Sequence, residues 1–282
     1  MKKRVLCVLI TVIMLLAMSN TASFAGNNQI VNEITSIEDI VKYNDQQNET
    51  PDPELTKKAL TTNLNRIKEL EEYEAKHLEE TFSSSEGSIS TMANPVTVNI
   101  GTDTTLTTGD DGWGDGSNSG YAQYRTAYSP YYKYAQSKTW TAGYGYADAY
   151  CYVGQRFIAK GTTAKSAKVI FSGSYKGSLL GGINGSATGE VKVKLWDATD
   201  SVWVGTVTVK TGSSNNNIAT YMNGNISHSI NAFIEPDHEY FPYIHVVTTA
   251  SQYGAQVSRG DFYDDGSDDE MIKYTSIKID FI

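Results

Sequence analysis

The sequence EVKVKLW at residues 190–196 alternates apolar and charged side chains. Its two valines and its leucine fall on one face of an extended chain and its two lysines on the other, because successive side chains of a strand point to opposite sides. The segment IKIDF at residues 277–281 repeats this period of two. Such alternation is typical of antiparallel strands that bury one face. The pattern therefore predicts a β-rich fold.

Further runs of this kind follow residue 95, separated by clusters of Gly, Asn, Asp and Ser. Turn signals recur about every 8–12 residues and predict about nine to eleven strands in the domain at residues 95–282. That number is too large for a minimal immunoglobulin sandwich. We expect a mainly β fold, an antiparallel jelly-roll-like β-sandwich. The clearest additional runs are residues 96–100, 167–171, 202–210 and 240–249.

Residues 1–25 have the pattern of a secretory signal peptide. The basic start KKR at residues 2–4 precedes an apolar run at residues 5–18, and small and polar residues lead to Ala25. The apolar run has about 14 residues, whereas a transmembrane helix needs roughly 20. A membrane anchor is the alternative interpretation. We expect cleavage after Ala25 and no transmembrane anchor afterwards, so that the mature chain is secreted, extracellular or associated with the cell surface.

Residues 26–94 form an acidic segment with 14 acidic and 6 basic side chains. A short helix is expected after Ser36, whose hydroxyl can cap it. A longer helix is expected from Pro53 to about Phe82, because Pro favours the first helical position. A Ser/Gly linker at residues 83–92 then leads to the β domain.

The longer helix carries a narrow apolar stripe that glutamates interrupt at several positions, so the pattern gives only weak support for a long coiled coil. We interpret the segment as an acidic helical leader, either a propeptide or a stalk. The stripe consists of Leu60, Leu64, Ile67, Leu70 and Leu78.

Tyrosine is concentrated in residues 121–152, which hold ten of the nineteen in the chain. Four of these tyrosines alternate around Asp148 in one predicted strand, and the residues between them are small. In one interpretation the tyrosine row is exposed and stacks on sugar rings. In the other, the row is the inner face of the sandwich. The candidate ligand-binding residues are Trp113, Trp140, Tyr144, Tyr146, Tyr150 and Tyr152.

Two acidic clusters are candidate calcium sites, because calcium takes six to eight oxygen ligands that Gly-rich loops readily supply. Neither cluster has EF-hand spacing. Solvated acidic loops are the alternative. The first cluster contains Asp110, Asp111 and Asp115, and the second contains Asp261, Asp264, Asp265, Asp268 and Asp269.

The overall charge excludes some classes of function. The chain has 32 acidic and 23 basic residues and a net charge of −9, which argues against a nucleic-acid-binding protein. Removal of the signal peptide would leave Cys151 as the only cysteine, either a reactive thiol or, as its strand context favours, a buried small residue. No nucleophile elbow or zinc-protease helix is present. His245, in an alternating run, is interpreted as a core or interface residue.

These observations favour a secreted, non-catalytic binding or cell-surface protein that holds a polysaccharide or cell-envelope polymer through tyrosine and tryptophan, with calcium as a possible stabilising ion. The alternative is a secreted hydrolase made as a precursor, with residues 26–94 as its propeptide. A self-assembling or membrane-inserting protein is less favoured, because the acidic charge opposes binding to anionic lipids.

Overall fold

The computed structural model describes residues 36–83, 95–266 and 269–282. The predicted signal peptide, most of the predicted linker and Asp268 lie outside these residues. Among the described residues, no helix has the length and apolar character needed to cross a bilayer. The elements are α2 (Ile37–Gln46), α3 (Pro53–Ser83), β1 (Val96–Asn99), β2 (Thr104–Leu106), β3 (Asp111–Ser129), β4 (Tyr134–Gly154), β5 (Phe157–Lys160), β6 (Lys165–Gly181), β7 (Gly185–Asp197), β8 (Val202–Asn215), β9 (Ile218–Ile234), β10 (Glu239–Gln252), β11 (Val257–Phe262) and β12 (Met271–Phe281).

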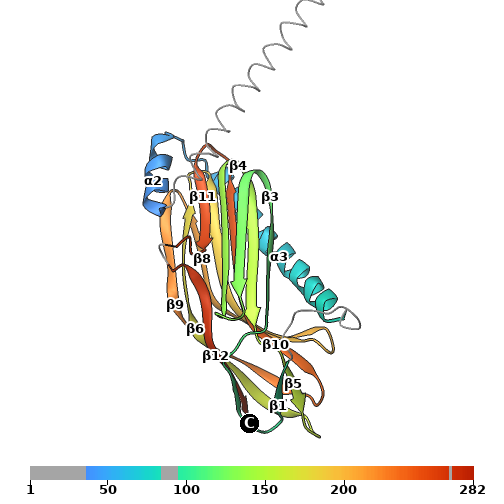
Figure 1. Ribbon diagram of the computed structural model, residues 1–282. Coiled ribbons are helices and arrows are strands. Elements are labelled where there is room, and N and C mark those ends of the chain that lie inside the picture. The colour runs from blue at the N-terminus through green and yellow to red at the C-terminus, as the bar shows by residue number, and fades with distance from the viewer. Residues whose placement is uncertain (1–35, 84–94, 267–268) are drawn as a thin grey trace, which may run out of the picture.

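The architecture is the predicted one, a mainly β, jelly-roll-like sandwich with helices at its N-terminal side (Figure 1). The strands run in the order β1-β5-β10-β4-β11-β6-β12-β2, while β3 pairs with β4, β7 with β10, β8 with β7, and β9 with β6. β1 and β5 pair in parallel, so the sheet is mixed rather than purely antiparallel. The described residues contain twelve strands, more than predicted, because β2 and β5 are too short to show a clear period.

The main hydrophobic core lies between the two layers of the sandwich. The predicted alternation supplies it, because Val191, Val193 and Leu195 of β7 belong to the same buried cluster as Ile277 and Ile279 of β12. Cys151 belongs to the same cluster, and burial raises the pKa of its thiol to about 12. The interpretation of Cys151 as a buried small residue is therefore confirmed.

The Gly-rich acidic stretch that we expected to be a loop is part of strand β3. It pairs with β4 from Asp111 opposite Gly154 onward. A Cβ atom at Gly112 would come within 2.6 Å of the Tyr128 ring, and one at Gly116 would come within 2.2 Å of a backbone oxygen of β4. The glycines are thus required by close packing, and the carboxylates between them are spread along an extended strand.

Both predicted helices are present. The Ser36 hydroxyl accepts a hydrogen bond from the backbone N–H of Asp39 and caps α2, as expected. Asp52 accepts one from the N–H of Glu54 and caps α3, which begins at Pro53 and ends one residue beyond the expected Phe82. Figure 1 shows α3 alongside the sheet, where it contacts β4, β7 and β10.

Candidate functional site

One side of the sheet faces α3 instead of the sandwich core, and we call it the α3 face. It consists of the odd-numbered residues 113–117 of β3, the even-numbered residues 146–152 of β4, the odd-numbered residues 241–251 of β10 and the even-numbered residues 186–196 of β7. Strand register aligns these side chains in rows across the four strands. One such row runs Trp113, Tyr152, His245, Lys192.

Three tyrosines of the predicted row, Tyr146, Tyr150 and Tyr152, lie on the α3 face. Tyr150 and Tyr152 are buried in a cluster with residues of α3, while Cys151 between them and Val153 after them belong to the core of the sandwich. The row is therefore neither the inner face of the sandwich nor, at these two positions, open to solvent. Our two interpretations both missed that the helical leader covers it. Tyr144 is 56% exposed.

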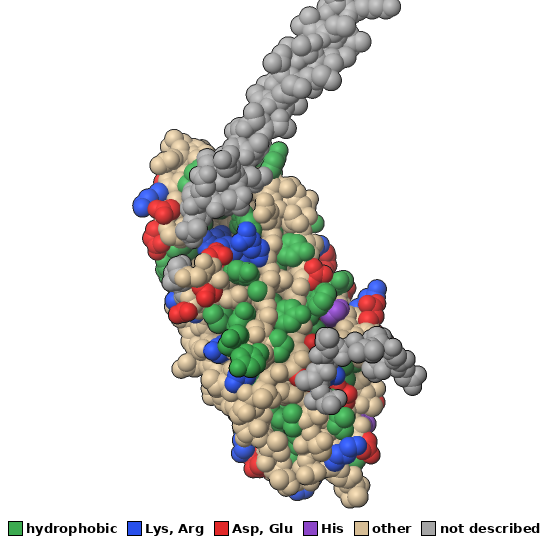
Figure 2. Space-filling model, in the orientation of Figure 1, with side chains coloured by type: hydrophobic (Ala, Val, Ile, Leu, Met, Phe, Trp, Pro, Cys, Tyr) green, Lys and Arg blue, Asp and Glu red, His purple; other side chains and the backbone are tan. Residues whose placement is uncertain are grey.

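The remaining candidate aromatics separate into two places. The Trp113 ring stacks on His77 of α3 with 4.5 Å between ring centroids, and Tyr146 lies against the guanidinium of Arg66. Trp140 instead packs with Ile37 and its neighbours under α2. The structure thus brings Trp113, Tyr146, Tyr150 and Tyr152 to one face and leaves Trp140 apart. Figure 2 shows hydrophobic side chains gathered on the surface near β3 and β4, with acidic side chains beside them.

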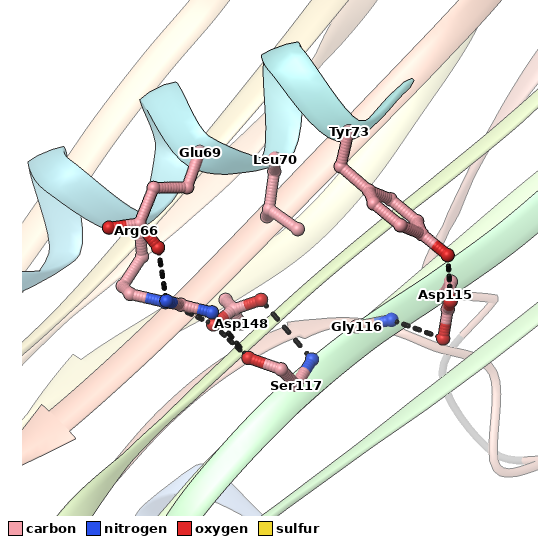
Figure 3. A pocket seen from close by; sticks show the side chains of 8 residues that line it. All are labelled: Arg66, Glu69, Leu70, Tyr73, Asp115, Gly116, Ser117 and Asp148. Atoms are coloured by element: carbon pink, nitrogen blue, oxygen red, sulfur yellow. Dashed lines mark hydrogen bonds and ion pairs between the residues drawn. The ribbon is translucent and has the colours of Figure 1, made fainter. Parts of the chain in front are cut away.

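An open pocket of about 350 Å³ lies where α3 meets β3 and β4. Figure 3 shows the side chains that line it and their hydrogen bonds. The floor comes from strands β3 and β4 and one wall comes from α3. The lining residues are Arg66, Glu69, Leu70, Tyr73, Asp115, Gly116, Ser117 and Asp148.

Asp148 is held in place on the floor of this pocket by several hydrogen bonds. It is fully buried and accepts hydrogen bonds from Arg66 Nε at 2.7 Å, from the Ser117 hydroxyl at 2.9 Å and from the Ser117 N–H at 3.2 Å. Arg66 also contacts Glu69 and the Ser117 hydroxyl. The charge-assisted bonds hold the floor and the α3 wall together.

Asp115 is the second carboxylate on the floor of the pocket. Its carboxylate accepts hydrogen bonds from the hydroxyls of Tyr73 and Tyr124, each at 3.2 Å. Burial and the nearby Asp115 charge raise the pKa of both phenols, so both remain protonated donors at neutral pH. The pocket therefore offers hydroxyl, carboxylate and guanidinium groups beside an aromatic ring.

A buried ionic cluster lies further along the helix, between α3 and β7. Glu74 has no exposed surface; its carboxylate accepts hydrogen bonds from Lys194 Nζ at 2.5 Å and from the Tyr243 hydroxyl at 2.8 Å. Glu71 pairs with Lys192 at 2.6 Å. These contacts explain the glutamates that interrupt the apolar stripe, because the lysines of EVKVKLW lie opposite them. His245 is buried beside them, as its interpretation as a core or interface residue required.

Three of the eight predicted calcium ligands are paired with cationic side chains in the described part of the chain. Asp110 pairs with Arg156, and burial raises its pKa to about 6. Asp261 contacts Lys138 and Arg259, and Asp265 contacts Lys138 and Arg125.

The three aspartates of the first predicted calcium cluster, which lie in β3 or directly before it, do not gather at one site. Burial raises the pKa of Asp111 to about 6, and Asp115 faces the pocket instead. Asp264 accepts a hydrogen bond from the Gly266 N–H, and Asp269 has a left-handed backbone conformation. Asp268 lies outside the described residues.

A different group, Asp197, Asp200 and His238, has ligand atoms within 4.8 Å of one another. Sequence analysis missed it because only the fold joins these two turns.

Calcium binding remains a prediction that thermal unfolding tests. An ion bound only to the native state stabilises it by about 2.7 kcal/mol at a concentration of 100 Kd. We expect a higher unfolding temperature in millimolar calcium than in chelator, and a smaller difference in Asp264→Asn. Equal unfolding temperatures in calcium and chelator would contradict calcium binding.

No family model and no curated protein matches this chain. Among solved structures, it is similar to the enzymatically active domain of bacteriophage CBA120 tailspike protein 4, with 10% identity and a TM-score of 0.23 over 61% of this chain and 19% of that chain. It is also similar to a family 11 carbohydrate-binding module from Clostridium thermocellum in complex with a mixed-linked tetrasaccharide, with 8% identity and a TM-score of 0.23 over 59% and 87% of the two chains. A third is TmCBM61 in complex with β-1,4-galactotriose, with 10% identity and a TM-score of 0.21 over 59% and 88%. Similarity at this level does not indicate what the chain binds.

Proposed function

We propose that this protein is a secreted, non-catalytic binding protein that holds a polysaccharide or cell-envelope polymer in the pocket between α3 and the β3–β4 hairpin. The observation that carries the proposal is the pocket itself, whose floor places Asp115, Ser117 and Asp148 beside tyrosine rings. Secretion follows from the predicted signal peptide.

The chemistry of the pocket suits a sugar. Its volume is within the range of small-ligand sites, which combine apolar walls with a few oriented polar groups. Aromatic faces such as that of Tyr73 can pack on the C–H face of a pyranose. The Asp115 carboxylate and the Arg66 guanidinium can hydrogen-bond to sugar hydroxyl groups more strongly than neutral groups can.

Retention on insoluble glycans and on cell-wall preparations tests the proposal with the purified full chain. We expect retention, and we expect Asp115→Ala or Tyr73→Ala to weaken it about tenfold, which corresponds to about 1.4 kcal/mol. Tyr131→Ala is the matched control, because Tyr131 is 83% exposed and does not line the pocket. Absence of retention, or retention unchanged by both pocket variants, would contradict the proposal.

One observation favours the alternative, a hydrolase. Asp115 and Asp148 are diagonal neighbours on β3 and β4, a relation that places Cβ atoms about 7 Å apart. Glycosidases use carboxylate pairs about 5–10 Å apart. Binding is nevertheless favoured, because both oxygens of Asp148 already accept hydrogen bonds from Ser117 and Arg66. Release of reducing ends that stops in Asp115→Asn would establish the hydrolase instead.

A further inference from the structure

The α3 face continues under the helix beyond the open pocket, and α3 does not satisfy all of its polar groups. Trp196 is 3% exposed and His245 is 1% exposed. Trp196 Nε1, His245 Nδ1 and Thr249 Oγ1 are buried and find no hydrogen-bond partner among the described residues. Buried polar groups are ordinarily hydrogen-bonded, so unused groups concentrated on one face need an explanation.

The same part of the face carries two lysines and several aromatic rings, together with Glu190 of β7, which pairs with Lys192 at 2.5 Å. Lys192 and Lys194 come from β7, and the Lys194 ammonium lies 4.6 Å from the centre of the Trp203 ring. Tyr152 and Tyr243 lie beside them, with 5.0 Å between ring centroids. Rings and ammonium groups on one sheet surface are suited to a ligand that has both sugar rings and negative charges.

The contacts that α3 makes here are partly apolar, through Ile67, Leu70 and Leu78, and partly ionic. Glu71 and Glu74 place carboxylates on Lys192 and Lys194, and the Tyr243 hydroxyl donates to Glu74. A buried ion pair adds little net stability compared with apolar side chains of the same size, although breaking it by removing one partner is costly. A permanent structural interface would gain more from apolar contacts. An interface that must open and then leave a soluble, charged surface requires the charges.

We propose that α3 is a displaceable cover and that the α3 face beneath it binds an anionic polysaccharide, whose carboxylates take the places of those of Glu71 and Glu74. This inference rests on the proposed carbohydrate-binding function and names its ligand class. The strand side of the open pocket, with Asp115, Ser117 and Asp148, is then the edge of a longer binding surface, and the α3 wall of the pocket moves away with the helix. Docking of α3 and binding of the polymer exclude each other, because both use Lys192 and Lys194.

Mutual exclusion has a measurable consequence. A ligand that binds only the uncovered state has its affinity reduced by the fraction of molecules that are uncovered. Fixing α3 on the sheet must therefore weaken binding, and loosening it must strengthen binding. A structural helix with no such role would give the same affinity in both cases.

A reversible disulfide can fix α3 at the end of the α3 face that lies away from Lys192 and Lys194. The Ser251 hydroxyl donates to the Ala59 carbonyl at 2.9 Å, so the two backbones approach closely near the start of the helix. We suggest Ala59→Cys with Ser251→Cys in the full chain, with loss of free thiol as the check on closure. Binding is measured to polygalacturonate and to neutral dextran, with and without reductant, and the unmodified chain controls for the reductant.

We expect the reduced form to bind polygalacturonate roughly tenfold or more tightly than the oxidised form. Equal binding of polygalacturonate in both forms overturns the cover but leaves the proposed function standing. Binding of dextran alone, unaffected by the disulfide, overturns the ligand class and the cover in the same way. Absence of binding to either polymer and to the cell-wall preparation, in both forms, overturns the proposed function as well.

A second variant keeps the proposal testable if the disulfide does not close. Glu74→Ala removes the partner of Lys194 from the helix and should raise the affinity for polygalacturonate by roughly tenfold or more. Glu72→Ala is the matched control, because Glu72 is exposed on the same helix. Affinity that is unchanged or lower in Glu74→Ala overturns the proposal.

Discussion

The Glu74→Ala variant is expected to lose about 3–5 kcal/mol of the stability with which α3 docks on the sheet, the usual cost of leaving one member of a buried ion pair without its partner. Lys194 is 2% exposed and would lose its ion-pair partner without Glu74. Denaturant unfolding, together with hydrogen exchange of the α3 amides, measures the loss.

Two controls separate this effect from general damage to the helix. Glu72→Ala should change stability by less than about 0.5 kcal/mol, as is usual for exposed positions. Replacing both Glu74 and Lys194 with Met should restore most of the loss, because apolar residues of similar volume can replace a buried ion pair. A Glu74→Ala variant as stable as Glu72→Ala would show that the buried pair does not hold α3 on the sheet.

Acidification below about pH 6.5 is expected to loosen α3, by at most about 1.4 kcal/mol for each pH unit. Burial, and then Lys194 and Lys192, keep the pKa of His245 well below its usual value. The docked state therefore excludes a proton that the uncovered state accepts, so its stability is present above pH 6.5 and is lost as the pH falls.

The groups around His245 determine this sign. Glu74 of α3 lies 3.5 Å from Nε2, but Lys194 already neutralises its carboxylate at 2.5 Å. The other neighbours, Tyr150 and Tyr243, are phenols that stay neutral in this pH range because burial raises their pKa. No carboxylate is therefore left to favour protonation of His245 in the docked state.

Hydrogen exchange of α3 between pH 7 and pH 5, corrected for the intrinsic exchange rate, measures the loosening. His245→Gln removes the titrating group and should remove the pH dependence. Global unfolding is a poorer measure, because Asp110 and Asp111, with pKa values raised to about 6, make the folded state more stable as the pH falls from about 6 towards 4. The same pH dependence in wild type and His245→Gln would contradict the role of His245.

Local pattern was sufficient to predict most of the elements. The period of two in EVKVKLW and IKIDF found β7 and β12, and the capping residues placed the starts of α2 and α3. We expected a loop where the first part of β3 lies. The glycines of this segment leave room for the rings of Tyr124 and Tyr128, and these contacts exist only after the hairpin has folded. Nothing in the local sequence distinguishes such glycines from those of a loop.

The candidate site was predicted only in part, for a similar reason. Alternation placed Tyr146, Tyr150 and Tyr152 on one face, but the covering layer was α3, which lies well upstream in the chain. Glu74 and Lys194 are 120 residues apart, and their pairing could not be deduced from either segment alone. The glutamates within an apolar stripe and the lysines of a buried strand were the signals that could have suggested it.

Hydrogen exchange of the full chain with and without polygalacturonate tests the central claim most directly. If α3 covers the binding surface, bound polymer should speed exchange of the amides in Pro53–Ser83 and slow that of β4 and β10, while β9 on the other layer stays unchanged. Bound polymer with α3 amides that exchange as slowly as before would contradict the account.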